Sequence, residues 1–116
     1  MSITRYKPGK LLSAAVEYAG TVYVSGQVAD DRSSGVLGQT EQVLEKIDAI
    51  LASAGTNKSN LLSANVWLAD IGTFDEMNQA WRAWVDSDNP PARATVQALL
   101  ARPEILVEIA VVCAKP

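Results

Sequence analysis

Apolar and polar residues follow patterns along the chain that predict five strands and two helices. Two stretches repeat apolar side chains every three or four positions, as in a helix that packs one face on a core, at residues 40–54 and 73–85. Five stretches rich in β-branched, aromatic and apolar residues predict strands, at residues 14–18, 21–25, 61–69, 93–98 and 105–113. The order strand, strand, helix, strand, helix, strand, strand predicts an α+β fold with a mixed sheet. No repeat or linker divides residues 1–116, so we expect one domain.

The last two predicted strands differ in pattern. The first alternates polar and apolar side chains and carries Arg93 on its polar face. The second, residues 105–113, is apolar throughout except for Glu108, which predicts a strand covered on both faces. If the two strands form an antiparallel hairpin centred between Leu100 and Ala101, Arg93 lies directly opposite Glu108, with Cβ atoms roughly 4.5–5.5 Å apart.

This predicted pair has two interpretations, and the pattern leaves both open. In the first, Arg93 and Glu108 form a structural ion pair, which lets the carboxylate stay charged in apolar surroundings. In the second, the fixed guanidinium binds an anionic substrate while the carboxylate handles a proton or a water molecule.

The two predicted helices can cover only one face of the sheet. The strand at residues 61–69 nevertheless places Trp67 on its second face, and residues 105–113 are apolar on both faces. No other segment remains to cover the second face. The pattern therefore predicts that another copy of the protein covers it.

Composition narrows the chemistry. The net charge of −3 and the scattered Lys and Arg residues argue against a nucleic-acid surface. The chain has no histidine and a single cysteine, Cys113, which excludes a Ser-His-Asp triad, histidine-ligated metals, an internal disulfide and a CxxC site. Acid and base chemistry must then come from carboxylates, Lys, Tyr or ordered water. No segment has the length of a membrane span or the pattern of a signal peptide, so we expect a cytoplasmic protein.

Two separated motifs resemble the signatures of the Rid/YjgF family of reactive intermediate deaminases. One is Pro-Ala-Arg-Ala-Thr-Val at residues 91–96, followed by Leu-Val-Glu-Ile at residues 106–109. The other is Val-Tyr-Val-Ser-Gly-Gln at residues 22–27. The resemblance extends over about residues 13–114. It implies a chorismate-mutase-like fold and a homotrimer with clefts between neighbouring subunits.

The resemblance also implies a reaction, the hydrolysis of reactive enamines or imines such as 2-aminoacrylate to a 2-oxo acid and ammonia, with no metal or other cofactor. Arg93 would hold the substrate carboxylate, and Glu108 would place and polarise a water molecule. The other residues that would line the pocket are Thr95, Gly26, Ser25 and Asn78. A non-catalytic trimer that binds small carboxylates, such as 2-oxo acids, in the same cleft is the alternative.

Some of these residues have structural interpretations beside the functional ones. Gly26 fits either a bulge or turn, or a point where a ligand approaches bare backbone. Asn78 fits either a buried structural amide or a polar group that points into a cleft. The chain also departs from the family pattern: Leu12 aligns with a tyrosine of the best-studied deaminases, and Thr95 stands where those enzymes often have cysteine. We expect the loss of the tyrosine to affect the rate and the range of imines.

Overall fold

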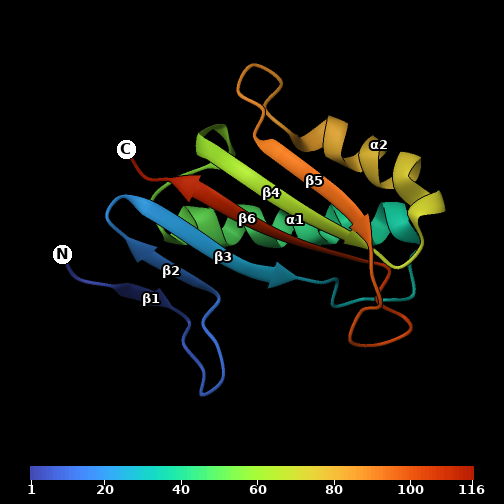
Figure 1. The fold of residues 1–116 in the computed structure, drawn as a ribbon, viewed down its shortest axis with the longest axis horizontal. Helices are drawn as coiled ribbons and strands as arrows, with labels where there is room; N and C mark the ends of the chain where they lie inside the picture. Colours follow the sequence, from blue (N-terminus) through green and yellow to red (C-terminus); the bar gives the residue numbers. More distant parts are fainter.

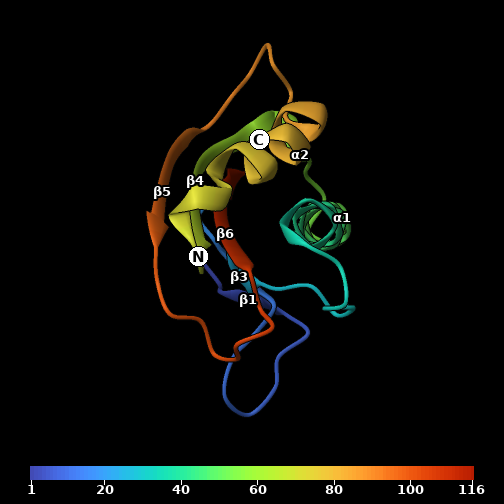
Figure 2. The ribbon, with the colours of Figure 1, turned by 90° about the vertical axis from the view of Figure 1, so that its right-hand side faces the viewer.

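A computed structural model describes residues 1–116 as a six-stranded mixed sheet with two helices packed on one face (Figures 1 and 2). The helices are α1 (Val36–Ser53) and α2 (Phe74–Trp84), with short 3-10 turns η1 (Lys58–Asn60) and η2 (Ile71–Thr73). The strands are β1 (Thr4–Tyr6), β2 (Ala15–Tyr18), β3 (Thr21–Gln27), β4 (Leu61–Leu68), β5 (Ala92–Gln97) and β6 (Val107–Ala114). The α+β class, the mixed sheet and the placement of both helices on one face were predicted correctly.

The strands lie in the order β1-β2-β3-β6-β4-β5, and only the β4–β5 pair is parallel. The predicted hairpin of the last two strands is therefore wrong, because β4 lies between them. Ala64 of β4 pairs with Arg93 on one side and with Val111 on the other, whereas Glu108 pairs with Trp67. The reason is that α2 connects β4 to β5, and a helical crossover of this kind joins parallel neighbours. The other edge of β4 is left for β6.

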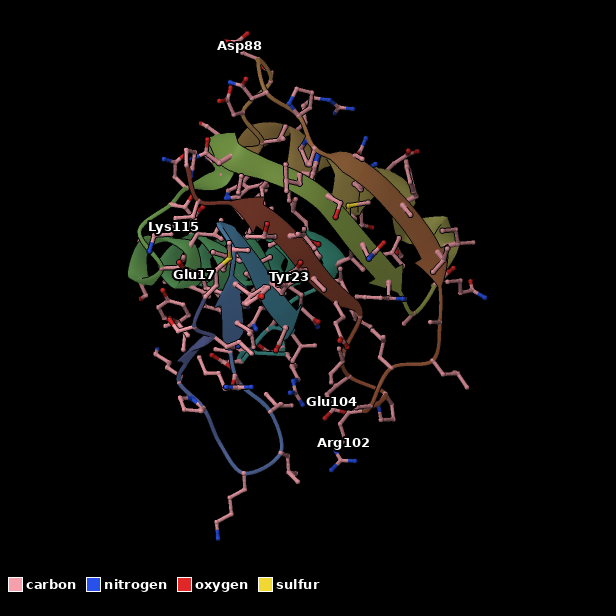
Figure 3. All side chains as sticks on the ribbon, turned by 60° about the vertical axis from the view of Figure 1, so that its left-hand side comes forward. Glu17, Tyr23, Asp88, Arg102, Glu104 and Lys115 are labelled. Atoms are coloured by element: carbon pink, nitrogen blue, oxygen red, sulfur yellow. The ribbon has the colours of Figure 1, made fainter.

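The helices and the sheet enclose one core cluster of 19 buried residues. Strand β6 shows how the two faces of the sheet differ, because Val107, Ile109, Val111 and Cys113 are buried under the helices while the residues between them are half-buried on the other face. Tyr23 of β3 lies on that open face with half of its surface exposed (Figure 3). The face that the pattern left uncovered is thus open in the single chain. Its coverage by a second copy stays a prediction.

A buried glutamine explains why α1 begins earlier than predicted. Gln39 is fully buried, and its amide nitrogen donates to the carbonyl oxygens of Ser34 and Glu104 at 3.0 Å each. Its amide oxygen accepts the N–H of Leu106 at 3.0 Å. The side chain thereby fastens the loop that precedes β6 to the first turn of α1. Neither helix is long and apolar enough to cross a membrane.

Candidate functional site

Arg93 lies on the edge strand β5 and faces the helices. Its guanidinium carbon is 5.6 Å from the centre of the Phe74 ring and 5.1 Å from the centre of the Trp81 ring. One guanidinium nitrogen, Nη1, donates to Oδ1 of Asn78 at 2.8 Å. These three partners are four and three positions apart on α2, so they share one helix face. Asn78 is therefore an amide that orients the guanidinium, in line with the structural interpretation of this residue.

No carboxylate neutralises Arg93. The three ion pairs of the structure are Arg32–Glu104, Lys46–Asp30 and Lys115–Glu17. Burial lowers the pKa of the Arg93 guanidinium, but an arginine stays charged at any physiological pH. Ring faces and an amide oxygen stabilise the cation without removing its charge. The guanidinium donors that Asn78 does not use remain free for an anion.

Thr95 follows Arg93 by two positions on the same face of β5. Its hydroxyl oxygen is the one buried side-chain oxygen or nitrogen in the protein that has no hydrogen-bond partner. Leaving a buried polar group unpaired costs about 1–3 kcal/mol, so such atoms are rare in native proteins. A shallow hollow of about 250 Å³ reaches Arg93 along β4 and β5, but most of its lining, Ser63, Asn65, Ala92 and Ala94, belongs to the opposite face of the sheet. The edge strand thus carries an unneutralised cation and an unpaired hydroxyl side by side.

Glu108 belongs to a second group of residues, on the open face of the sheet. Strand β3 shifts register between Val24 and Gln27, and this bulge brings Gly26 against the Glu108 side chain. The hydroxyl of Ser25 donates to the carbonyl oxygen of Ser13 at 2.5 Å, so it is occupied within the chain. The predicted residues Ser25, Gly26 and Glu108 therefore lie together, but Gly26 contacts the carboxylate directly.

The structure divides the predicted site into two groups. Arg93, Thr95 and Asn78 lie on the helix side of the sheet, and Glu108, Gly26 and Ser25 lie at the open face. Arg93 pairs with Ala64 of β4, and Glu108 pairs with Trp67 of the same strand. The two residues are therefore two strands apart across the sheet and three residues apart along it, which puts their Cα atoms on the order of 14 Å from each other. The prediction that the two side chains face each other is wrong, and no ion pair joins them within one chain.

The helical pattern of residues 73–85 identifies Phe74 and Trp81 only as members of the apolar face of the second helix. The structure shows that their rings also flank the Arg93 guanidinium. The sequence held one signal of this role, since Asn78 interrupts the apolar stripe between them. A polar side chain inside such a stripe indicates that something charged or polar packs against it.

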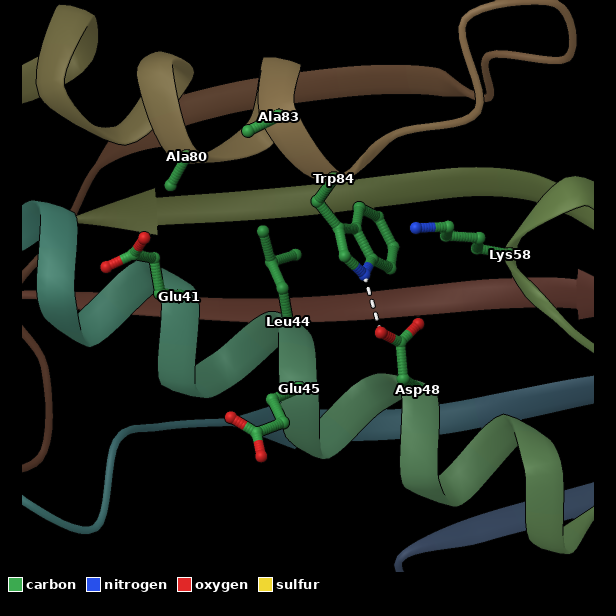
Figure 4. A pocket seen from close by; sticks show the side chains of 8 residues that line it. All are labelled: Glu41, Leu44, Glu45, Asp48, Lys58, Ala80, Ala83 and Trp84. Atoms are coloured by element: carbon green, nitrogen blue, oxygen red, sulfur yellow. Dashed lines mark hydrogen bonds between the residues drawn. The ribbon is translucent and has the colours of Figure 1, made fainter.

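A third region, between the two helices, contains none of the predicted site residues. It is a hollow of about 240 Å³ over Leu44, Ala80 and Ala83 (Figure 4). The indole nitrogen of Trp84 donates to a carboxylate oxygen of Asp48 at 2.9 Å across it. This contact fastens α2 to α1, and we assign the hollow a packing role.

The fold and the site define the class of this protein: an α+β domain in which a mixed sheet presents a ring-flanked, unneutralised arginine at its edge. A family model described as endoribonuclease L-PSP matches residues 3–115. A member of the YjgF protein family from Neisseria meningitidis has a crystal structure that superposes with a TM-score of 0.97, at 40% identity, over 100% of this chain and 97% of that one.

Curated relatives agree over nearly the full length. A RutC family protein of Haemophilus ducreyi is 43% identical over 112 residues, which are 97% of this chain and 96% of the relative. The RutC family protein YoaB of Escherichia coli is 40% identical over 98% of this chain and 99% of its own. The chain therefore belongs to the Rid/YjgF family, as its two motifs predicted.

Proposed function

We propose that this protein is a deaminase that hydrolyses 2-imino acids and their enamine tautomers to 2-oxo acids and ammonia. The observation that carries the proposal is the state of Arg93, a partly buried cation held by Phe74, Trp81 and Asn78 with no carboxylate of its own. Such a cation is suited to a small ligand that supplies a carboxylate. A planar guanidinium can bind that carboxylate through two parallel hydrogen bonds.

The reaction needs little more than a placed water molecule. The imine carbon is already electrophilic, so neither a metal nor a covalent nucleophile is required. Water adds to this carbon, and Glu108 accepts a proton from the water as the new C–O bond forms. The imine nitrogen takes up the proton that Glu108 accepted and then the proton that the new hydroxyl releases as the carbonyl forms, the C–N bond breaks, and ammonia leaves the 2-oxo acid.

The two groups of site residues suggest that the active site is shared between copies of the chain. Arg93 and Glu108 cannot reach one substrate within a single chain, because they lie on opposite sides of the sheet. In our proposal the edge strand of one copy meets the open face of its neighbour, which joins the Arg93 group of one to the Glu108 group of the other. Two different surfaces that meet in this way form a ring when the rotation between copies closes, and the family resemblance suggests a homotrimer.

The description of the matching family model names a ribonuclease, but the residues here favour a small substrate. The net charge of the chain is −3, and the Arg93 group offers one cation rather than a cluster. Binding along a nucleic acid requires several Lys or Arg side chains on one surface. We therefore propose an imino or oxo acid as the partner.

A coupled assay tests the reaction. An amino acid oxidase generates 2-imino acids from a panel of amino acids, and semicarbazide traps what is not hydrolysed. The wild-type protein should suppress trapping, and Arg93→Ala should not. If the wild type suppresses no trapping for any amino acid, the proposed activity is wrong.

A mixing experiment tests the shared site. Arg93→Ala and Glu108→Gln should each be inactive, whereas trimers assembled from equal amounts of both should regain about a quarter of the wild-type sites, because half of each contributing surface is intact. Native mass spectrometry would establish that the subunits have mixed. Mixed but inactive trimers would show that Arg93 and Glu108 do not serve one site from two chains.

One observation favours a second candidate function, a protein that binds small carboxylates without turnover. The Arg93 group is complete within one chain and does not need Glu108 in order to hold an anion. In that case the wild type binds 2-oxo acids in calorimetric titrations but hydrolyses no imine. For a deaminase, Glu108→Gln should instead abolish turnover while largely keeping the affinity for the 2-oxo acid.

A further inference from the structure

We propose that Gly26 is a positioning residue for Glu108: the missing side chain of this glycine creates the space that fixes the carboxylate where it meets the water. The inference rests on the proposed deaminase function. It gives Gly26 a role different from the contact between a ligand and bare backbone that its motif suggested.

The contact between the two residues leaves no room for a side chain at position 26. A Cβ atom built on Gly26 would lie 2.1 Å from Oε2 of Glu108, 3.0 Å from Cδ and 3.2 Å from Cγ. The severe overlap is with Oε2, while Cδ and Cγ lie at the close limit of ordinary contact, so the end of the Glu108 side chain has to turn away to admit a Cβ. Restoring ordinary contact would move the carboxylate by at least about 1 Å.

Backbone conformation does not explain why position 26 is a glycine. Among the glycines, only Gly20 and Gly55 have the positive φ that other residues avoid. Gly26 has a backbone that an alanine can adopt, so the space taken by Glu108 is the reason that a Cβ is excluded.

The rest of the bulge holds Gly26 still. The N–H of Ser25 donates to the carbonyl oxygen of Ala14 at 2.9 Å, and the Ser25 hydroxyl donates to Ser13. The side-chain amide of Gln27 donates to the carbonyl oxygen of Ser25 at 3.0 Å. These bonds tie the backbone that precedes the glycine, and the pairing of Gln27 with Ile109 of β6 places the residue that follows it.

The Glu108 carboxylate itself takes part in none of the ion pairs or side-chain hydrogen bonds of the structure. Packing against Gly26 is a contact that restrains it, and its oxygens stay free to accept a hydrogen bond from water. Hydrogen-bond donors from the protein would also restrain a carboxylate, but they would occupy the lone pairs that a water molecule needs. The arrangement positions the group and leaves its oxygens available to a water molecule.

The first test is Gly26→Ala in the coupled imine assay. A catalytic group displaced by about 1 Å can lose on the order of 100-fold in rate, so kcat should fall by about that factor. KM should change little, because the Arg93 group is untouched. The matched control is Gly35→Ala: position 35 has ordinary extended backbone with φ −75° and no atom within 4 Å of an added Cβ. An unchanged kcat in Gly26→Ala would overturn the proposal.

Two double variants separate positioning from general damage. Glu108→Asp shortens the side chain by one methylene, roughly 1.5 Å, and should restore part of the activity lost in Gly26→Ala. In a Glu108→Gln background, where turnover is already lost, Gly26→Ala should leave the affinity for a 2-oxo acid unchanged, because the glycine acts only through the carboxylate. A loss of that affinity would also overturn the proposal.

Thermal melting tests the contact without any activity. Gly26→Ala should lower Tm in the wild-type background and lose most of that effect in Glu108→Ala, where the overlap is gone. If the wild type hydrolyses no imine, the proposed function fails, and this melting cycle still decides whether Glu108 is what excludes a Cβ at position 26. An equal drop in Tm in both backgrounds would contradict the contact.

Discussion

The two groups of site residues are built on opposite principles. Side chains assemble the Arg93 group: two rings and an amide surround the guanidinium from one face of α2. The Glu108 group depends on a side chain that is missing, because Gly26 leaves the space that the carboxylate occupies. A flat, delocalised cation is held well by ring faces that do not neutralise it. A carboxylate that must bind water is better held by shape, since hydrogen-bond donors would occupy its oxygens.

The largest expected effect comes from breaking the Arg93 group. Two charge-assisted hydrogen bonds are worth about 3–4 kcal/mol, so Arg93→Ala should raise the KM for 2-imino acids roughly 100- to 1000-fold. Arg93→Lys keeps the charge but not the planar pair of parallel donors, so we expect an intermediate increase in KM. Steady-state kinetics checks both variants, with the exposed Arg82→Ala on α2 as the control. Equal KM values in all four proteins would remove Arg93 from substrate binding.

The next effect concerns the loop that leads to Glu108. Gln39→Leu leaves the N–H of Leu106 and the carbonyl oxygens of Ser34 and Glu104, all at partly buried contacts, without the partner that the buried amide supplies. We expect the free energy of unfolding to fall by about 2–4 kcal/mol, measured by denaturant titration. Gln79→Leu, at an exposed position of α2, should change it far less. Similar losses in both variants would mean that the buried amide has no special role.

A smaller effect should follow when a carboxylate is introduced beside Arg93, so that the cation is neutralised within the chain. Asn78→Asp would place a carboxylate beside the Arg93 guanidinium, which is 2.8 Å from the present amide oxygen. The new carboxylate would compete with the substrate, so KM should rise roughly tenfold while Tm is kept or raised. Kinetics and melting curves measured together distinguish this outcome. A fall in Tm with an unchanged KM would contradict the assignment of Arg93 as an unneutralised anion-binding cation.

The smallest effect lies far from both groups, where Tyr6 donates to Glu17 at 2.5 Å and Lys115 pairs with the same carboxylate. The hydrogen bond from Tyr6 is the main cause that lowers the pKa of Glu17 below its ordinary value of 4.5. Glu17 therefore stabilises the fold above pH 4.5, and this contribution is lost as the pH falls through the lower pKa of the folded state.

Tyr6→Phe should accordingly lower Tm near neutral pH, and the difference from the wild type should shrink in acid. Melting curves across this range give the result. Tyr18→Phe is the control, because Tyr18 is exposed and its hydroxyl makes no hydrogen bond within the chain. A difference that grows in acid would mean that the tyrosine does not act through the charged form of Glu17.

Local patterns predicted the elements well, because helix and strand periodicity depends on residues close in sequence. They could not predict which strands become neighbours. Arg93 and Glu108 were each recognised, but their pairing was inferred from adjacency in the chain, and the helix α2 makes β5 a neighbour of β4 instead. The short strand β1 was missed for a related reason, since its three residues become a strand only by pairing with β2.

The same limit applies to the site. Each member was found from motifs, yet its role depended on contacts between distant segments. Gly26 could be named as a site residue, but only the side chain of Glu108 against it shows what the glycine is for. Trp81 could be placed in the core, but its place beside the guanidinium needed β5 to lie against α2.

The position of β6 has a consequence for how the protein is made. This strand comes last in the chain but lies in the middle of the sheet, where it joins β3 to β4. During synthesis the edge of β3 in the β1–β3 portion and the edge of β4 in the β4–β5 portion therefore stay unpaired until β6 has been translated. A chain that stops before Val107 can never join them. Since unpaired edges are templates for aggregation, an unfinished chain is exposed to chaperones and proteases until its last strand closes the sheet.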